Sequence, residues 1–462
     1  MMKEYDFVFI YEVKNRELDS VLLMKCELER RGYSVYLVET WERDIIRTNP
    51  VIANVAVCFA LYNDDIFRFV RQFVKNCNKF VNLQWEQINT NGTEISQEND
   101  SNDAAGFYGV AKKAVHISWG QYNYWKLTQK YGIDAKLVRI CGNVNLDFLR
   151  DEFRSLYLSR DEMEHRYSME GYESLYLFIS SFSYADLPET ILDQDIYKNQ
   201  SFDVKKHCEL SYYSRIKILE WFERELRYHP KTLIIYRPHP AEKNSDVLKN
   251  LEKQYSNFRV YGDLSIRQWI LIADKIYMWW STSIAEVFLA NKGCEILRPM
   301  SLPYVNELQI YKEARFIKTF EEFDRTFDSK SEFPINSINV ERFYNIDKNT
   351  PSFIRVCNVL EEVLGDDNYS ISELEYLAKP YPYWRFHNFK RRVMSLALGN
   401  DYVFRFLRRI LGQRIIKSGK TIETYKREYD YAMEMISKNR YIDDEVSEKT
   451  KVIKLILERY YK

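Results

Sequence analysis

The chain has 462 residues, 46% of them hydrophobic and 29% charged, enough apolar material for two or three domains and too much for wholesale disorder. Lysine plus arginine and aspartate plus glutamate both number 67, so the formal net charge is zero and no nucleic-acid partner is expected. The seven cysteines are dispersed without a CxxC pair, which favours small core residues in a reducing compartment.

The first predicted elements form a βαβ unit. Residues 7–11 are a continuous apolar run, as in a strand buried on both faces, and a helix with apolar spacing follows and stops at Gly32. Further strand-like runs are found at 33–38, 55–59, 80–83, 114–117 and 137–140. This alternation predicts a doubly wound, Rossmann-like domain over residues 1–150.

The N-terminal residues lack the apolar core of a signal peptide, and no stretch approaches 18 apolar residues. We therefore expect a cytoplasmic protein, with a peripheral location at the membrane's inner face as a further expectation. The polar stretch 90–103 predicts a long surface loop of the kind that often borders a site. The charged segment 151–170 predicts a linker helix.

A second alternation begins at residues 175–179 and predicts another Rossmann-like domain over 171–365. It contains a helix at 211–226 and strands at 232–236, 258–261, 275–279 and 294–297. The predicted fold is thus α/β, with two Rossmann-like domains facing across a cleft, and domain interfaces are where ligand sites concentrate.

Residues 366–462 differ in character and predict a helical, basic C-terminal extension. Between 379 and 420 there are eleven Lys or Arg and a single acid, Asp401. Apolar residues at 404, 407 and 411 share a helical stripe, while arginines at 405, 408 and 409 lie on another face. Such a helix suits an anionic membrane surface or, alternatively, packs across the domains with its arginines solvated.

The most informative motif is Tyr236-Arg237-Pro238-His239-Pro240, directly after a predicted strand. Two prolines fix the backbone around His239, so its imidazole loses little entropy on binding. His239 and Arg237 both donate hydrogen bonds suited to phosphate oxygens. The alternative is a turn that ends a strand, with an incidentally exposed histidine.

The second motif, Ser281-Thr282-Ser283, follows another predicted strand and precedes a short helix. Because ligands of open α/β sheets bind at the carboxyl ends of strands, both motifs predict one nucleotide phosphate site. Ser283 and Glu286 also have the spacing of a capping box, and Glu286 is alternatively a ribose ligand. Arg298, after the next strand, is either a further cation on the same rim or an ordinary surface residue.

Candidate residues also follow strands of the N-terminal half. Glu86 stands beside Trp85, and an apolar neighbour would raise its carboxyl pKa toward that of a general base; the alternative is a surface glutamate or a loop anchor. Charged residues after the first strand, and polar or glycine positions after later strands, are candidates to line the cleft: Glu12, Lys14, Arg16, Trp119, Gly142 and Asn143.

Several site types are not indicated by the sequence. It contains no GxxxxGK[ST], no GxGxxG after the first strand, no HExxH, no GxSxG and no DxD at the position of a metal-dependent sugar transferase. We therefore expect no metal and no cofactor.

The order of the motifs resembles a known family. Residues 82–87, 116–120, 142–149 and 178–183, read together with the HP and Ser/Thr-Ser motifs, are similar to GT-B glycosyltransferases of bacterial surface carbohydrate biosynthesis. The nearest resemblance is to the sialyltransferase, capsule Kdo-transferase and CDP-glycerol-transferase groups. The acidic Asp/Glu-Asp/Glu-Gly signature of many sialyltransferases is not recognisable here.

The resemblance implies a metal-independent, inverting glycosyltransferase. It assigns nucleotide phosphate binding to His239 and to residues 281–283, and acceptor deprotonation to Glu86. The implied partners are a nucleotide-sugar donor, first of all a CMP-linked sugar, and a glycan or glycolipid acceptor of the capsule or lipopolysaccharide type. The alternatives are a CDP-glycerol-type transferase, an epimerase, and a non-catalytic scaffold of a polysaccharide assembly complex.

Overall fold

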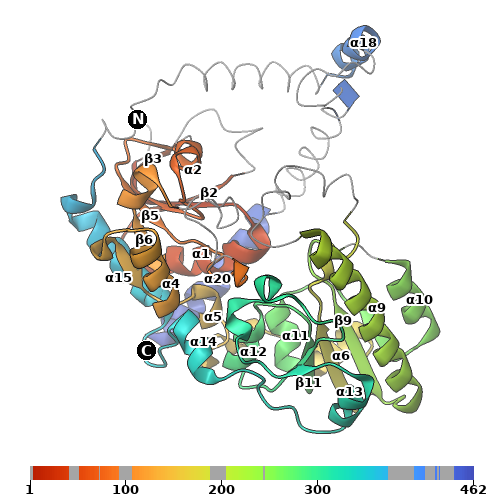
Figure 1. Ribbon diagram of the computed structural model, residues 1–462. Helices are drawn as coiled ribbons and strands as arrows, with labels where there is room; N and C mark the ends of the chain where they lie inside the picture. Colours follow the sequence, from red (N-terminus) through yellow and green to blue (C-terminus); the bar gives the residue numbers. More distant parts are fainter. Residues whose placement is uncertain are drawn as a thin grey trace. The chain divides into compact units, whose positions relative to one another are not determined.

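The computed structural model describes residues 4–40, 51–71, 73–92, 107–187, 204–242, 245–372, 400–411, 422–423, 426 and 442–461. They contain two parallel β-sheets with helices packed against them (Figure 1). The described chain divides into two compact units, residues 1–83, 113–115 and 357–462 in the first and residues 84–112 and 116–356 in the second. The domain limits at 150 and 365 stay predictions.

The first sheet has the strand order β2-β1-β3-β5-β6-β7, with β4 beside β3. Residues Phe7 to Tyr11 of β1 are all buried, as the continuous apolar run predicted. The strands are β1 (Glu4–Tyr11), β2 (Val35–Glu39), β3 (Val51–Cys58), β4 (Val74–Lys75), β5 (Lys79–Asn82), β6 (Val115–Ser118) and β7 (Val138–Ile140). Their helices are α1 (Lys14–Arg30), α2 (Asp64–Val70), α4 (Gln121–Trp125) and α5 (Val144–Asp147).

The second sheet has the order β10-β9-β8-β11-β12-β13. Its strands are β8 (Ser174–Ile179), β9 (Thr232–Arg237), β10 (Phe258–Val260), β11 (Lys275–Met278), β12 (Glu295–Leu297) and β13 (Phe316–Ile317). Its helices are α9 (Val204–Tyr228), α10 (Asp246–Gln254), α11 (Ile266–Ile272), α12 (Ile284–Leu289), α13 (Phe320–Phe327) and α14 (Ser337–Tyr344).

Alternate residues of these strands enter two hydrophobic clusters on opposite faces of the second sheet. Leu175, Leu177 and Ile179 of β8 pack with residues of α11, α12 and α14. Tyr176 and Phe178 pack instead with residues of α9, α10 and α13. Figure 1 shows these two groups of helices on either side of β9 and β11. Because side chains of a strand alternate between faces, a strand with no polar alternation has helices on both sides.

The segment predicted as one linker helix is broken in the structure. Residues Asp151–Leu156 form a 3-10 helix, and α6 (Arg160–Tyr167) starts afresh. Ser159 caps α6, because its hydroxyl accepts from the backbone N–H of Glu162 while the Glu162 carboxylate accepts from Ser159. This capping box ends any continuous helix over 151–170.

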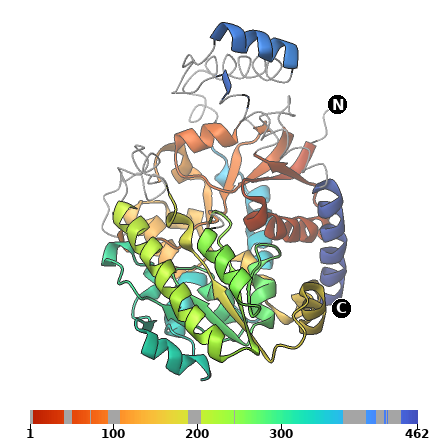
Figure 2. The ribbon, with the colours of Figure 1, turned by 90° about the vertical axis from the view of Figure 1, so that its right-hand side faces the viewer.

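Within the first unit, the chain's last helix lies along its first. Helix α20 (Ile442–Tyr460) runs beside α1, as Figure 2 shows. Lys449 forms an ion pair with Asp19 at 2.8 Å, and the Tyr461 hydroxyl donates to Glu27 at 2.9 Å. Further helices of the C-terminal part are α15 (Ser352–Gly365) and α18 (Asp401–Leu411).

The predicted fold class is confirmed in its two Rossmann-like α/β sheets and its helical C-terminal segment. Much of the predicted basic stretch 379–420 and of the predicted loop 90–103 lies outside the described residues. All seven cysteines are buried and none forms a disulfide, as expected for core residues. Among the described helices, none is both long and apolar enough to cross a membrane.

Candidate phosphate site and a separate pocket

The two motifs identified in the sequence follow strands that flank one central strand. Strand β8 pairs with β9 on one side and with β11 on the other, so Arg237 and Met278 are both in register with Ile179. His239 follows β9, Ser281 follows β11, and Ser180 follows β8. All three strands are parallel, so these residues emerge at the same carboxyl edge of the sheet, where open α/β sheets bind ligands.

His239 is exposed and has a defined tautomer. Its Nδ1 accepts a hydrogen bond from the backbone N–H of Ala241 at 3.1 Å, which leaves the proton of the neutral ring on Nε2. Partial burial lowers the pKa of His239 below its usual value, and the positive charge of Arg237 lowers it further. At neutral pH the imidazole is therefore a neutral donor that presents Nε2–H to a ligand.

Arg237 is half-buried and already has carbonyl acceptors. Its Nη2 donates to the Leu264 carbonyl oxygen at 2.9 Å, and its Nη1 lies 3.5 Å from the carbonyl oxygen of Tyr261. The guanidinium therefore ties the His239 loop to the segment that follows β10. Its contact with phosphate stays a prediction.

The Ser281–Ser283 segment is held by hydrogen bonds between side-chain hydroxyls and its backbone. The Ser281 hydroxyl accepts from the backbone N–H of Ser283 at 3.2 Å, and Thr282 is exposed. Tyr311 bonds both backbone groups of Ser281, at 3.0 Å to the N–H and 2.8 Å to the carbonyl oxygen. Tyr311 therefore fixes the shape of this turn at the sheet edge.

The capping-box prediction for Ser283 and Glu286 is wrong. Ser283 is the N-cap residue of α12, but its backbone is helical and its side chain accepts no cap hydrogen bond. Its hydroxyl instead donates to the Glu286 carboxylate. Burial raises the pKa of Glu286, and the charge of Arg267 opposes that rise. A contact of Glu286 with ribose stays a prediction.

Arg298 does not lie on a surface rim in this structure, because only 2% of it is exposed. Its Nη2 forms an ion pair with Glu307 at 2.9 Å, and its Nη1 donates to the carbonyl oxygen of Trp279. Aromatic rings of Trp279, Tyr311 and Phe316 surround the guanidinium. Arg298 thus supports the end of β11 from within the core.

Glu86 is exposed, in contrast to the apolar surroundings that its tryptophan neighbour suggested. Trp85 is buried, so the two side chains point to different environments. The next residue, Gln87, has a structural role: its Oε1 accepts from the Trp119 backbone N–H at 2.7 Å and its Nε2 donates to Ile117.

The other cleft candidates of the second unit make internal contacts. Trp119 is buried and stacks on Tyr344, with ring centroids 5.6 Å apart. Gly142 has a φ of +84°, and a Cβ there would lie 2.4 Å from the Ser352 hydroxyl. Asn143 is the N-cap of α5, accepting from the backbone N–H of Asn145. The close approach expected at Gly142 therefore comes from the protein itself.

In the first unit, the charged residues after β1 gather around a buried carboxylate, Glu17. The backbone N–H of Glu12 donates to Glu17 at 2.8 Å, and Arg16 forms an ion pair with it at 2.6 Å. Burial raises the pKa of Glu17 in spite of these bonds. Lys14 is the first residue of α1. Glu17, rather than Glu86, has the desolvated environment expected of a base.

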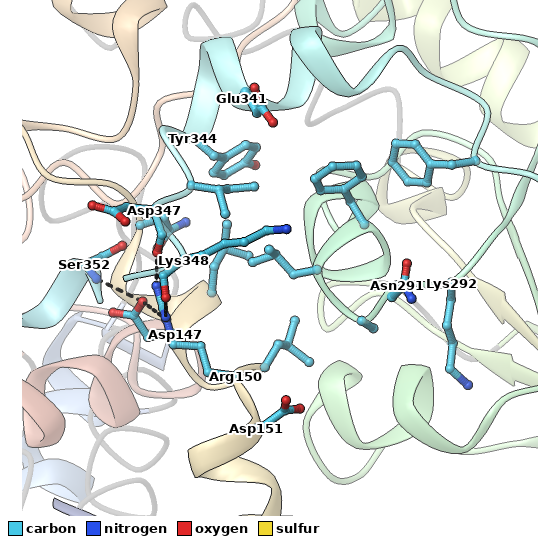
Figure 3. Close-up of a pocket in the computed structure, with 18 of the residues that line it drawn as sticks. Asp147, Arg150, Asp151, Asn291, Lys292, Glu341, Tyr344, Asp347, Lys348 and Ser352 are labelled. Atoms are coloured by element: carbon cyan, nitrogen blue, oxygen red, sulfur yellow. Dashed lines mark hydrogen bonds and ion pairs between the residues drawn. The ribbon is translucent and has the colours of Figure 1, made fainter. Parts of the chain in front are cut away.

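A separate pocket of about 1050 Å³ lies in the second unit (Figure 3). Helix α12 begins beside Ser283, and its last residue, Leu289, lines this pocket, so the pocket and the phosphate motifs lie at opposite ends of the helix. At its wall the buried Asp147 carboxylate accepts from the Ser352 backbone N–H at 2.9 Å and from Arg150. Its lining is mixed, with Phe288, Lys292, Tyr344 and Lys348 among the residues; only Asn143 was a sequence candidate.

Several residues that hold the phosphate motifs were not among the predicted site residues, although Ser180 and Ser181 belong to the 178–183 motif. Ser180, Ser181 and Glu242 are buried side chains at the same sheet edge. The available signals were two serines directly after an apolar strand, and an acid following the His-Pro pair.

The sequence matches no protein-family model and no curated protein. Similar solved structures include the S. aureus MnaA–UDP co-structure, with 10% identity, 78% of this chain and 97% of that chain covered, and a TM-score of 0.46. A variant of the wall teichoic acid polymerase TagF, soaked with CDPG, has 11% identity, coverages of 78% and 89%, and a TM-score of 0.48. The Methanocaldococcus jannaschii UDP-GlcNAc 2-epimerase, in complex with UDP-GlcNAc and UDP, has 11% identity, coverages of 78% and 100%, and a TM-score of 0.45.

Proposed function

We propose that this chain is a metal-independent, inverting glycosyltransferase of bacterial surface polysaccharide synthesis that uses a cytidine-nucleotide donor, first of all a CMP-linked sugar. The observation that carries the proposal is that His239, with its proton on Nε2, follows β9 while Ser281 and Thr282 follow β11, so both groups stand at the carboxyl edge of one sheet, on either side of β8. Neutral donors at the carboxyl edge of a parallel sheet suit the phosphate of a nucleotide. The motif order in the sequence supports the choice of family.

In the proposed reaction, an acceptor hydroxyl attacks the anomeric carbon of the donor sugar. A new carbon–oxygen bond forms on one face while the bond from that carbon to the phosphate oxygen breaks, and the configuration inverts. The acceptor proton goes to a carboxylate, for which Glu86 is the sequence candidate. His239 Nε2–H and the hydroxyls of Ser281 and Thr282 stabilise the negative charge that develops on the leaving phosphate.

The exposure of Glu86 favours a second candidate, a binding protein of the same fold that has no turnover. The two candidates predict the same nucleotide binding and differ in product release. A CDP-glycerol-type transferase differs from the first candidate only in the donor, and an epimerase would act on a nucleotide sugar without any acceptor.

Thermal stability with added nucleotides tests the phosphate site. A ligand that binds only the folded state raises the melting temperature. We expect CMP or CDP to stabilise the protein more than UDP, GDP or ADP, and His239→Ala to abolish the effect. His165→Ala is the matched control, since His165 is an exposed histidine of α6. Equal stabilisation of wild type and His239→Ala would contradict the proposed site.

We further propose that α18 places the enzyme on an anionic membrane, where a glycolipid acceptor would be found. The exposed apolar stripe of this helix is not the predicted one, whose Phe404 and Leu407 are half-buried; it consists of Tyr402, Phe406 and Ile410, at 86%, 63% and 56% exposure. Arg405 and Arg409 are exposed beside the stripe. An exposed apolar stripe flanked by arginines has the chemistry of an interfacial helix on anionic lipid.

A further inference from the structure

A buried carboxylate lies directly beneath the His239 loop. Glu242 follows the His-Pro pair, and its side chain has no exposed surface. One carboxylate oxygen accepts from the Ser180 hydroxyl at 2.5 Å and from the backbone N–H of His239 at 3.2 Å. The other accepts from the Tyr236 hydroxyl at 2.6 Å. Three donors from three different positions thus converge on one acidic side chain.

Two hydroxyl groups and a guanidinium surround the Glu242 carboxylate, and they favour a hydrogen-bond acceptor there. The hydroxyls of Ser180 and Tyr236 lie 2.8 Å apart, and Arg215 Nη1 is 4.0 Å from the Glu242 carboxylate. Arg215 is itself fixed by two parallel bonds to Asp186, at 2.6 and 2.7 Å. Burial raises the pKa of Glu242, while the hydrogen bonds from Ser180, Tyr236 and His239 oppose that rise.

The neighbouring serine makes the corresponding contact with the second motif. The Ser181 hydroxyl accepts from the backbone N–H of Trp280 at 3.1 Å, directly before Ser281. Ser180 and Ser181 are both buried, at 3% and 6% exposure. The end of the central strand β8 is therefore bonded to both loops of the candidate phosphate site, through Glu242 on one side and through Trp280 on the other.

We propose that Glu242, linked to β8 by Ser180, is the positioning residue that fixes the His239 imidazole with its proton on Nε2; Ser181 is the corresponding positioning residue for the Ser281 loop. The proposal rests on the proposed phosphate site. Glu242 holds the turn in which its own backbone N–H donates to the His239 carbonyl oxygen at 2.8 Å. The same turn brings the Ala241 N–H to His239 Nδ1.

The chemistry predicts which substitutions disturb the ring. Glu242→Gln replaces one carboxylate oxygen with an NH₂ group, so the backbone N–H of His239 and the hydroxyls of Ser180 and Tyr236 have one acceptor oxygen in place of two. Ser180→Ala removes one donor from Glu242 and leaves the carboxylate in place. Either change loosens the turn and allows the Nδ1–H tautomer of His239 to become populated.

Long-range nitrogen–proton NMR correlation of the histidine rings measures this tautomer directly. The chain has six histidines, and His239→Ala assigns the relevant signal. We expect the wild type to show Nε2–H alone, and Glu242→Gln and Ser180→Ala to show both tautomers. Affinity for CMP, measured by calorimetry, should fall about tenfold with Glu242→Gln, a change of about 1.4 kcal/mol.

Glu322→Gln is the matched control, because Glu322 also accepts from a backbone N–H, that of Lys318, but lies at the start of α13. It should change neither the His239 signal nor CMP affinity. Ser180→Ala keeps the test open if Glu242→Gln does not fold. An unchanged Nε2–H signal in the folded variants would overturn the proposal even if CMP binds. A changed signal in a protein that binds no nucleotide would leave the positioning role standing and overturn the proposed function instead.

Discussion

The hydroxyl of Tyr311 bonds both backbone groups of Ser281, accepting from its N–H at 3.0 Å and donating to its carbonyl oxygen at 2.8 Å. Tyr311 is buried and belongs to the segment that follows β12. Strand β12 pairs with β11 on the side away from β8, the strand that Ser180 and Ser181 follow. The shape of the Ser281–Ser283 turn therefore depends on a side chain that is distant in the sequence.

Tyr311→Phe should destabilise the protein and weaken the candidate site together. The substitution removes one hydroxyl and leaves two backbone groups without their partner, at a cost of about 1–3 kcal/mol in the free energy of unfolding. Denaturant unfolding measures this cost, and nucleotide affinity should fall in parallel. Tyr304→Phe, at an exposed tyrosine, is the control and should change neither quantity. A stable Tyr311→Phe protein with unchanged nucleotide affinity would show that the turn does not need this support.

Asp147 should make stability depend on pH in an unusual direction. Burial raises the pKa of its carboxyl from 3.8 to about 6 in the folded protein, although Ser352, Phe353 and Arg150 all donate to it. A raised folded-state pKa in an acid means that the folded state holds the proton more tightly. Its stabilising contribution is therefore fully present below the unfolded pKa and is lost as pH rises through the folded pKa, by about 3 kcal/mol in total.

Comparison of wild type with Asp147→Asn isolates this contribution, because the other titrating groups are common to both. Denaturant unfolding between pH ~4 and ~6.5 measures the unfolding free energy of both proteins. The value for the wild type minus the value for Asp147→Asn should decrease as pH rises. Asp134→Asn, at an exposed helix cap, supplies the control. A difference that is flat across this range would mean that Asp147 titrates at its ordinary pKa.

Glu86→Gln tests the proposed base. If Glu86 accepts the acceptor proton, its amide variant should bind the nucleotide normally and lose about 10²–10⁴-fold in turnover. The measurement is the rate of nucleotide release from the donor in the presence of acceptor, with nucleotide affinity measured separately. Glu17→Gln is the informative comparison, because Glu17, in the first turn of α1, is buried and has a raised pKa. If Glu17→Gln loses turnover and Glu86→Gln keeps it, the base is Glu17 and not Glu86.

Helix α18 should direct the full chain to anionic vesicles. Replacing Arg405, Arg408 and Arg409 with Gln removes three charges, each contributing about 1 kcal/mol near an anionic surface, so binding should fall roughly a hundredfold. Phe406→Ser should also weaken binding, through loss of apolar burial. Co-sedimentation with phosphatidylcholine vesicles, with and without phosphatidylglycerol, measures both effects.

Leu455→Ser is the matched control for Phe406→Ser, since Leu455 is an exposed apolar residue of α20. It should leave vesicle binding unchanged. Equal binding of wild type and the triple arginine variant to the phosphatidylglycerol vesicles would contradict the role of α18.

Periodicity in the sequence determined the secondary structure and the class of fold. The apolar runs that begin at Phe7 and at Leu175 are strands in the structure, and they are buried on both faces. An unbroken run of apolar residues already predicts this burial from the sequence. The placement of His239 and Ser281 at strand ends was also predictable, because each motif directly follows an apolar run. Parallel strands then bring such ends to one edge.

Tertiary structure alone decided what supports those motifs and which candidates are available to a ligand. Glu242 bonds Ser180, and Tyr311 bonds Ser281, between segments that follow different strands, and a single sequence does not record which strands are neighbours. Arg298 is a surface residue by composition, yet Glu307 and the Trp279 carbonyl oxygen compensate its burial. Trp85 predicted apolar surroundings for Glu86, but consecutive side chains point in different directions, and only the folded chain shows that the carboxylate is exposed.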